Sequence, residues 1–339
     1  MNAAEKTALI DKALARLTAH EMACRLCPRG CGVNRAAGER GFCQSGTLAV
    51  VSHALLHYGE EPVLSGRAES DEALRGNEQP PGSGTIFFAG CNLKCLFCQN
   101  YQLSWRSQGK EVGDDTLAGM MLKLQAAGAL NINLVSPTHL LIPILRALRL
   151  AYLKGLGIPL VYNSNGYEKS ETVALLDGIA DIYLPDLKYF APEVSARYSG
   201  APDYFAFAGP ALKEMYMQRP ALRLDDREIA REGLIVRHLV LPGQTGDSRS
   251  LLGWLAGRLS PAVPLSLMSQ YHPCFQAPEE LNRHLRPEEY REVLQKAEEL
   301  GFQTMFVQPG DFSPAERLVP DFDLAEPFSW GGKRRAGPA

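Results

Sequence analysis

Three cysteines stand close together in the stretch GCNLKCLFCQN at residues 90–100. Cys91, Cys95 and Cys98 are separated by three residues and then by two. Three thiolates on one tight loop cannot form a simple disulfide pair, but they can bind a metal centre from one side. A closed zinc site would need a fourth ligand, such as Cys274 or a histidine. A 4Fe–4S cluster held by three thiolates would instead leave one iron free for a ligand that is not protein.

Four more cysteines lie near the N-terminus, at Cys24, Cys27, Cys31 and Cys43. Four thiolates can close a tetrahedral zinc site or anchor an auxiliary iron–sulfur cluster, and their spacing does not decide between the two. A role in handling substrate is a third alternative. We expect no disulfides, because they are rare in reducing cytosol. Cys274 stands alone, and we expect it to serve packing.

The composition is that of a globular protein. The chain has 339 residues, of which 45% are hydrophobic and 22% are charged, and the formal net charge is −3. This charge gives no reason to expect binding to nucleic acid or to a membrane surface. No apolar stretch reaches the length of a membrane span, and the charged N-terminus does not resemble a signal peptide. We therefore predict a cytoplasmic protein.

From residue 85 onward, strand-like and helix-like segments alternate. Such an alternation predicts a parallel sheet covered by helices. The number of units favours a partial (β/α)6–7 barrel over the full eightfold one, with a doubly wound sheet as the alternative. The expected strands are 85–90, 131–136, 159–164, 181–187, 234–241, 264–270 and 303–308. The expected helices are 114–127, 140–154, 170–178, 206–218, 247–259 and 287–300.

Four regions follow from this pattern. Residues 1–64 hold an expected helix at 5–20, the four-cysteine segment and a short strand pair within 47–57. Residues 65–84 are polar and rich in Gly, Pro and Ser, which predicts an exposed loop. Residues 85–310 form the expected barrel, and 311–339 form a tail that wraps the body.

The cysteine loop follows the first expected barrel strand, at the edge where barrel enzymes place their chemistry. Asp186 and Lys188 follow the fourth strand, where they are either site residues or a surface ion pair. Arg237 lies inside the apolar run LIVRHLVLPG, and its buried charge requires a carboxylate partner.

The loop CxxxCxxC resembles the hallmark of the radical S-adenosylmethionine (SAM) superfamily, as does the aromatic Phe97 before the last cysteine. More closely, residues 24–310 resemble uncharacterised iron–sulfur proteins related to pyruvate formate-lyase activating enzyme. The shared words include CRLCPRGC, GEEP, GCNLKCLFCQNY, YNSNGYE, DIYLPDLKY, VRHLVLPG and SQYHP.

This resemblance implies a 4Fe–4S cluster that reductively cleaves SAM, with hydrogen abstraction from a substrate by the 5′-deoxyadenosyl radical. It also implies an external one-electron reductant of the flavodoxin or ferredoxin type. The substrate is open: a glycine of a partner enzyme, another protein or peptide, or a small molecule. A non-catalytic iron–sulfur electron carrier is the alternative from a different class.

The resemblance also implies contacts to SAM from the strand ends. Activating enzymes carry a Gly-Gly-Glu word after the second strand, and this chain has Ser136, Thr138 and His139 there, so one of these is expected to contact the amino group. Arg237 is expected to bind the methionyl carboxylate, with an internal salt bridge as the alternative. The other expected contacts are Asn163, Ser164, Asp186, Lys188 and His272, the last with a hydrogen-bonded core histidine as the alternative.

Overall fold

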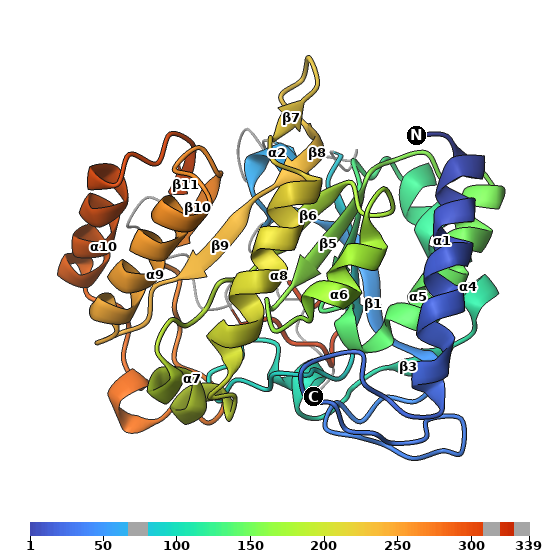
Figure 1. Cartoon of the computed structure of the whole chain (residues 1–339), viewed down its shortest axis with the longest axis horizontal. Coiled ribbons are helices and arrows are strands. Elements are labelled where there is room, and N and C mark those ends of the chain that lie inside the picture. Colours follow the sequence, from blue (N-terminus) through green and yellow to red (C-terminus); the bar gives the residue numbers. More distant parts are fainter. Residues whose placement is uncertain (67–80, 308–318, 329–339) are drawn as a thin grey trace, which may run out of the picture.

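The structure is a computed structural model, and it describes residues 1–66, 81–307 and 319–328. Parallel strands dominate it (Figure 1). One run of parallel neighbours is β2 (Ser83–Phe88), β4 (Ile132–Val135), β5 (Leu160–Ser164), β6 (Ile182–Pro185) and β8 (Ala230–Leu234). A second run is β9 (Val236–Leu239), β10 (Leu265–Met268) and β11 (Met305–Val307).

The two runs continue one another. A parallel bridge between Asp186 and Arg237 links the end of β6 to β9. The strand expected at 234–241 corresponds to β9, which lies beside β10, and the additional strand β8, which ends at Leu234, lies beside β6. The arrangement confirms the predicted α/β fold, a partial barrel of parallel strands with cysteines in its N-terminal segment.

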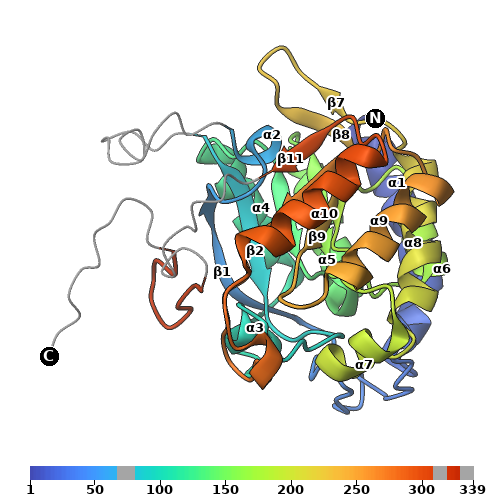
Figure 2. The ribbon, with the colours of Figure 1, turned by 90° about the vertical axis from the view of Figure 1, so that its left-hand side faces the viewer.

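Helices connect the strands and cover the outside of the sheet, as Figures 1 and 2 show. Their apolar faces are buried; α5, for example, buries nine of its thirteen residues. The N-terminal helix α1 (Ala3–Leu17) starts at a capping box of Asn2 and Glu5 and packs against α5. The connecting helices are α4 (Asp114–Ala126), α5 (Leu141–Leu153), α6 (Ser170–Val173), α7 (Pro192–Ser199), α8 (Tyr204–Gln218), α9 (Thr245–Arg258) and α10 (Pro287–Glu299).

The edge of the barrel beside β2 differs from the sequence expectation. Residues 47–57 were expected to form a strand pair, but they contain one long strand, β1 (Ala49–His57), antiparallel to β2. Its outer edge pairs with β3 (Lys110–Val112), and β7 (Arg223–Leu224) pairs with β8 at the far edge of the sheet. Two short helices flank this region, α2 (Pro62–Ser65) and α3 (Tyr101–Ser104).

The C-terminal segment 319–328 lies against β1, β2 and α3. Phe322 is 3% exposed, and its ring centroid lies 5.3 Å from that of Phe87 on β2. The Gln102 amide donates to both Asp321 and Asp323 at 3.1 Å. This segment therefore covers the open edge of the barrel. The loop predicted at 65–84 and the rest of the tail predicted at 311–339 lie largely outside the described residues.

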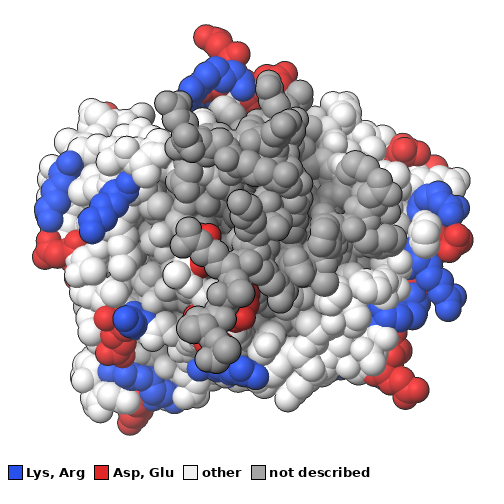
Figure 3. All heavy atoms as spheres, turned by 180° about the vertical axis from the view of Figure 1, so that it is seen from behind, with Lys and Arg blue, Asp and Glu red and all other residues white. Residues whose placement is uncertain are grey.

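The surface carries charges of both signs. Figure 3 shows Lys and Arg interspersed with Asp and Glu around the rim of the face seen from behind. Among the helices in the described ranges, none combines the length and the apolar composition that a membrane crossing needs.

Candidate active site

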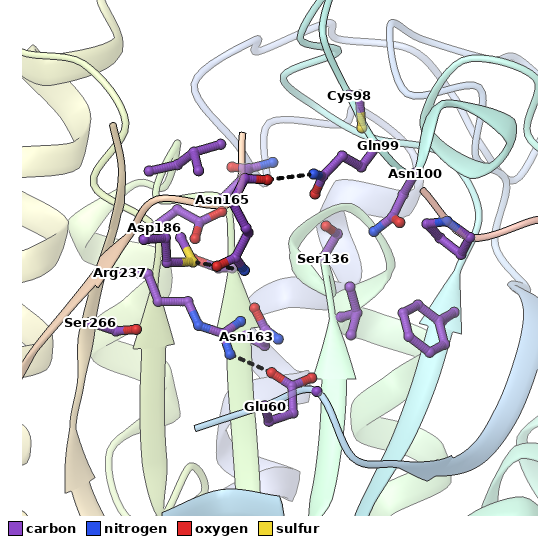
Figure 4. A pocket seen from close by; sticks show the side chains of 18 of the residues that line it. Glu60, Cys98, Gln99, Asn100, Ser136, Asn163, Asn165, Asp186, Arg237 and Ser266 are labelled. Carbon is purple, nitrogen blue, oxygen red and sulfur yellow. Dashed lines mark hydrogen bonds and ion pairs between the residues drawn. The ribbon is translucent and has the colours of Figure 1, made fainter. Parts of the chain in front are cut away.

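A cavity of about 760 Å³ opens on the inner side of the barrel (Figure 4). Side chains from the ends of the parallel strands line it together with the cysteine loop. In Figure 4, Cys98 and Gln99 lie at one end and Glu60 at the other, with Arg237 and Asn163 between them. A volume of this size is typical of small-molecule and cofactor sites.

The cysteine loop forms one end of the cavity, and each of its thiols accepts a hydrogen bond. Cys91 Sγ accepts from the Asn165 amide at 3.4 Å, and Cys95 Sγ accepts from the Ser199 hydroxyl at 3.1 Å. Cys98 Sγ accepts from the Ser104 hydroxyl at 3.2 Å. Such bonds stabilise negative charge on sulfur and tune the potential of an iron–sulfur cluster.

Burial determines the pKa shifts of two of the three thiols. Burial and the neighbouring thiol of Cys95 raise the pKa of Cys98 to about 12. Burial likewise raises the pKa of Cys91. Thiols of this kind become ligands only when a metal displaces their protons, so binding of a cluster would release protons.

The thiols suit a cluster better than a single ion. Within the described ranges, no group of three or more His, Cys, Asp and Glu side chains is arranged to hold one metal ion. A 4Fe–4S cluster takes each thiolate on a different iron, so its ligands do not converge on one point. The donor set, two buried thiols and the half-buried thiol of Cys98 beside an open cavity, therefore fits the cluster that the sequence predicts.

The N-terminal segment holds the cysteine loop in place. Arg29 donates to the backbone oxygens of Asn92 at 2.9 Å and Leu93 at 3.3 Å. Gly90 has φ +84°, and a Cβ at this position would lie 2.5 Å from the backbone oxygen of Cys43. Only glycine allows both this backbone conformation and this close approach.

Ten of the predicted active-site residues line the cavity. They come from the cysteine loop, from the ends of β4, β5 and β6, and from the start of β9. They are Cys91, Cys95, Phe97, Cys98, Ser136, Asn163, Ser164, Asp186, Lys188 and Arg237.

Ser136 occupies the first position of the word that replaces Gly-Gly-Glu. Its φ of +55° is in the left-handed region, which non-glycine residues rarely adopt. Its amide donates to the backbone oxygen of Asn163 at 2.8 Å, which ties the turn after β4 to β5. The strained turn directs Ser136 to the cavity, and strain of this kind is common at functional sites.

Asp186 and Lys188 form an ion pair of 2.6 Å in the wall of the cavity. Their side chains are 23% and 20% exposed, so this is not the surface ion pair considered as the alternative. Burial acts to lower the pKa of Lys188, but the Asp186 carboxylate outweighs it and raises that pKa. The lysine is therefore a fixed positive charge beside the cavity.

Arg237 pairs with carboxylates of the chain itself. Its guanidinium forms a bidentate pair with Glu61, with distances of 2.8 and 2.6 Å, and a further hydrogen bond with Glu60. The internal salt bridge, which was the alternative, is thus what the structure contains. Burial acts to raise the pKa of Glu60, but Arg237 and His57 outweigh it and lower that pKa. Glu60 and Glu61 lie at the start of α2 and belong to the word GEEP, whose role the sequence did not reveal.

Three predicted SAM contacts lie away from the cavity. Thr138 and His139 are each 1% exposed, because the chain after Ser136 turns into the core as the 3-10 helix η3 (Thr138–Leu140). Thr138 donates to the Glu168 carboxylate, and His139 Nε2 lies 2.9 Å from the backbone oxygen of Ala89. His272 is not among the lining residues either, and its ring packs against His284 with centroids 4.9 Å apart.

Glu168 is a buried acid that sequence reasoning missed. It is 0% exposed, and burial raises the pKa of its carboxyl to about 7. Besides Thr138, the Tyr162 hydroxyl donates to it at 3.4 Å. The residue ends the word YNSNGYE, so only its place in a shared motif signalled it.

The N-terminal cysteines are divided between the interior and the surface. Cys24, Cys27 and Cys43 are buried, and Cys31 is exposed. Burial raises the pKa of Cys27 to about 12, and Cys43 and Cys24 lie close enough to add to this rise. Cys43 Sγ accepts from the Arg35 guanidinium at 3.4 Å. No single-ion site forms among them within the described ranges, so a zinc ion, one of the alternatives from the sequence, has no preformed tetrahedral site there. Cys274 donates to the backbone oxygen of Phe97 at 3.4 Å.

Comparison with known proteins identifies similar sequences and folds. The family model of the Radical SAM superfamily matches residues 85–251. An uncharacterized protein of Methanocaldococcus jannaschii is 32% identical over 294 residues, which cover 84% of this chain and 76% of that protein.

Two solved structures have more distant similarity. Streptococcus suis SuiB is 13% identical, with a TM-score of 0.44, over 67% of this chain and 48% of its own. The structure of anSMEcpe with bound AdoMet is 15% identical, with a TM-score of 0.43, over 61% of this chain and 56% of its own. The chain thus spans about half of the length of these solved chains.

Proposed function

The chain belongs to the radical SAM superfamily, and from this membership we propose that its cavity is the site where a substrate loses a hydrogen atom. When bound, a 4Fe–4S cluster and SAM supply a 5′-deoxyadenosyl radical, which can remove hydrogen from an unreactive carbon. The observation that carries the proposal is that one cavity collects the three thiols and polar side chains from four strand ends.

Each part of the cavity has a role in this reaction. Cys91, Cys95 and Cys98 would hold the cluster. Polar side chains at the strand ends would orient SAM, with Lys188 available to its carboxylate. The surrounding wall would exclude water, which protects a reactive radical. We propose that an external one-electron carrier of the flavodoxin or ferredoxin type supplies the electron.

The cleavage of SAM tests this function directly. Anaerobically reconstituted protein, reduced with dithionite, is expected to convert SAM into methionine and 5′-deoxyadenosine, measured by chromatography. Cys95→Ala should abolish the reaction. Cys274→Ala is the matched control, because this thiol bonds to a backbone oxygen and is not predicted to bind the cluster. Cleavage that survives in reconstituted Cys95→Ala would reject the site.

The nature of the substrate is a finer proposal. The resemblance to proteins related to pyruvate formate-lyase activating enzyme makes a glycine of a partner enzyme one candidate. Electron paramagnetic resonance on such a partner would detect a glycyl radical. We favour the second candidate, another protein, a peptide or a small molecule, because the charged residues Glu60, Glu61 and Arg237 in the cavity wall could bind a charged group, which a glycine lacks.

A further inference from the structure

We propose that the charged end of the cavity, formed by Glu60, Glu61 and Arg237, binds a cationic group of the substrate, either an ammonium or a guanidinium. The proposal rests on the proposed function, because it assigns this end of the cavity to the substrate and the cysteine loop to the cofactor. It specifies the chemical class of a substrate that the fold alone leaves open.

The first observation is an excess of negative charge. Two carboxylates, Glu60 and Glu61, share the single guanidinium of Arg237, and the three side chains are 6%, 5% and 13% exposed. Asp186 and Lys188 balance each other in their own ion pair. Among the described residues at this end, and leaving the imidazole of His57 aside, the carboxylates therefore exceed the fixed positive charges by one in a largely desolvated setting, where an unpaired charge is costly. A positively charged group entering the cavity would compensate it.

The second observation is a pair of polar side chains open to the same part of the cavity. Asn163 and Ser266 are 8% and 5% exposed and line the cavity. Neither side chain makes a hydrogen bond within the described part of the chain, and both lie beside Arg237 in Figure 4. Buried polar groups are nearly always paired. The amide oxygen and the hydroxyl oxygen can accept the N–H groups of a bound cation.

An internal group competes for the same role. His57 Nδ1 lies 3.3 Å from the Glu60 carboxylate, and a protonated imidazole would supply the missing positive charge from within. SAM is a second competitor, since its sulfonium is also positive. An experiment must therefore separate three sources of positive charge: the imidazole, the cofactor and a substrate.

Matched probes make this separation. The reconstituted full-length protein, with SAM bound, is titrated anaerobically with Nα-acetyl-lysine methylamide and with its neutral counterpart Nα-acetyl-norleucine methylamide. Isothermal titration calorimetry is expected to show at least about tenfold tighter binding of the lysine probe, which corresponds to about 1.4 kcal/mol. The arginine counterpart of the probe then distinguishes ammonium from guanidinium recognition.

Two variants connect this preference to the charged end. Glu61→Gln removes the excess charge and leaves Arg237 paired with Glu60, so the chain is expected to fold, as circular dichroism will check. In this variant the preference for the lysine probe should disappear. In His57→Gln, which removes the internal competitor, the preference should persist.

Several results would overturn the proposal. Equal binding of the lysine and norleucine probes by the wild type would do so, as would an undiminished preference in Glu61→Gln. A lysine probe that binds only to His57→Gln would show that the imidazole fills this role. Weaker binding of SAM by Glu61→Gln, with the probe preference intact, would assign the charged end to the cofactor. Failure of the wild type to cleave SAM without any probe would instead reject the proposed function, so the two failures are distinct.

Discussion

Replacement of Arg237 by methionine should destabilise the protein even when no cofactor is bound. The substitution keeps a long apolar stem but removes the guanidinium, so two buried carboxylates lose their arginine partner. Loss of one partner from a buried ion pair typically costs about 3–5 kcal/mol. We expect a loss of this size, because Glu60 and Glu61 are both less than one-tenth exposed.

Denaturant unfolding of the cofactor-free protein, followed by circular dichroism near neutral pH, measures this loss. A triple variant that also carries Glu60→Gln and Glu61→Gln is the control, and it should recover most of the stability because none of these three positions then carries a buried charge.

The pH dependence of the unfolding free energy is a second criterion. The folded state lowers the pKa of Glu60, so its ion pair stabilises the fold above the ordinary glutamate pKa of about 4.3 and loses this effect as the pH falls. The difference in unfolding free energy between wild type and Arg237→Met should therefore become smaller at acidic pH.

The opposite pattern would refute the reasoning. If cofactor-free Arg237→Met is as stable as the wild type to within about 1 kcal/mol and its only defect is weak SAM binding, the guanidinium pairs with the cofactor. The sequence prediction that Arg237 binds the methionyl carboxylate of SAM would then be supported. The internal salt bridge would not stabilise the fold.

Three further predictions concern other parts of the site. Gly90→Ala should lower both the unfolding midpoint and the iron content, because the added Cβ would lie 2.5 Å from the backbone oxygen of Cys43. An iron content equal to that of the wild type would contradict this close contact. Glu168→Gln should be more stable than the wild type at about pH 8, by up to roughly 3 kcal/mol, because a buried carboxyl with a raised pKa loses stability as the pH rises from about 4.5 to 7. This gain should vanish in acid, and a gain independent of pH would point to another cause. Metal analysis of Cys24→Ala should show a loss of iron if the N-terminal cysteines bind an auxiliary cluster, and a loss of zinc if they bind that ion. Equal metal content in variant and wild type would mean that these cysteines bind neither.

The strands and helices of the barrel were predictable because local signals specify them. Each expected barrel strand matches an observed one to within a few residues, and the helix expected at 287–300 matches α10 closely. Pro287 at its first turn gave a clear start signal. The single strand β1 was not predicted, because residues 58–82 separate it from its antiparallel partner β2 and no local turn joins the two strands.

The site was predictable only in part, for a similar reason. The cysteine loop is a local motif, and the strand ends follow from the alternation of elements. The partner of Arg237 does not follow from any local pattern, because Glu61 lies 176 residues earlier in the chain. Thr138 and His139 lie within three residues of Ser136, but the turn after β4 places them in the core. Sequence spacing indicates which residues are near a strand end, but it does not indicate which side they face.

The segment that covers the open edge of the barrel has a consequence for synthesis of the protein. Phe322 and Phe328 pack on Phe87, which the ribosome adds more than two hundred residues earlier. At typical rates of about 5–20 residues per second, the barrel strands would be complete several seconds or more after β2 emerges, and this segment would follow them. This segment can therefore cover the wall beside β2 only after the last barrel strand has been made.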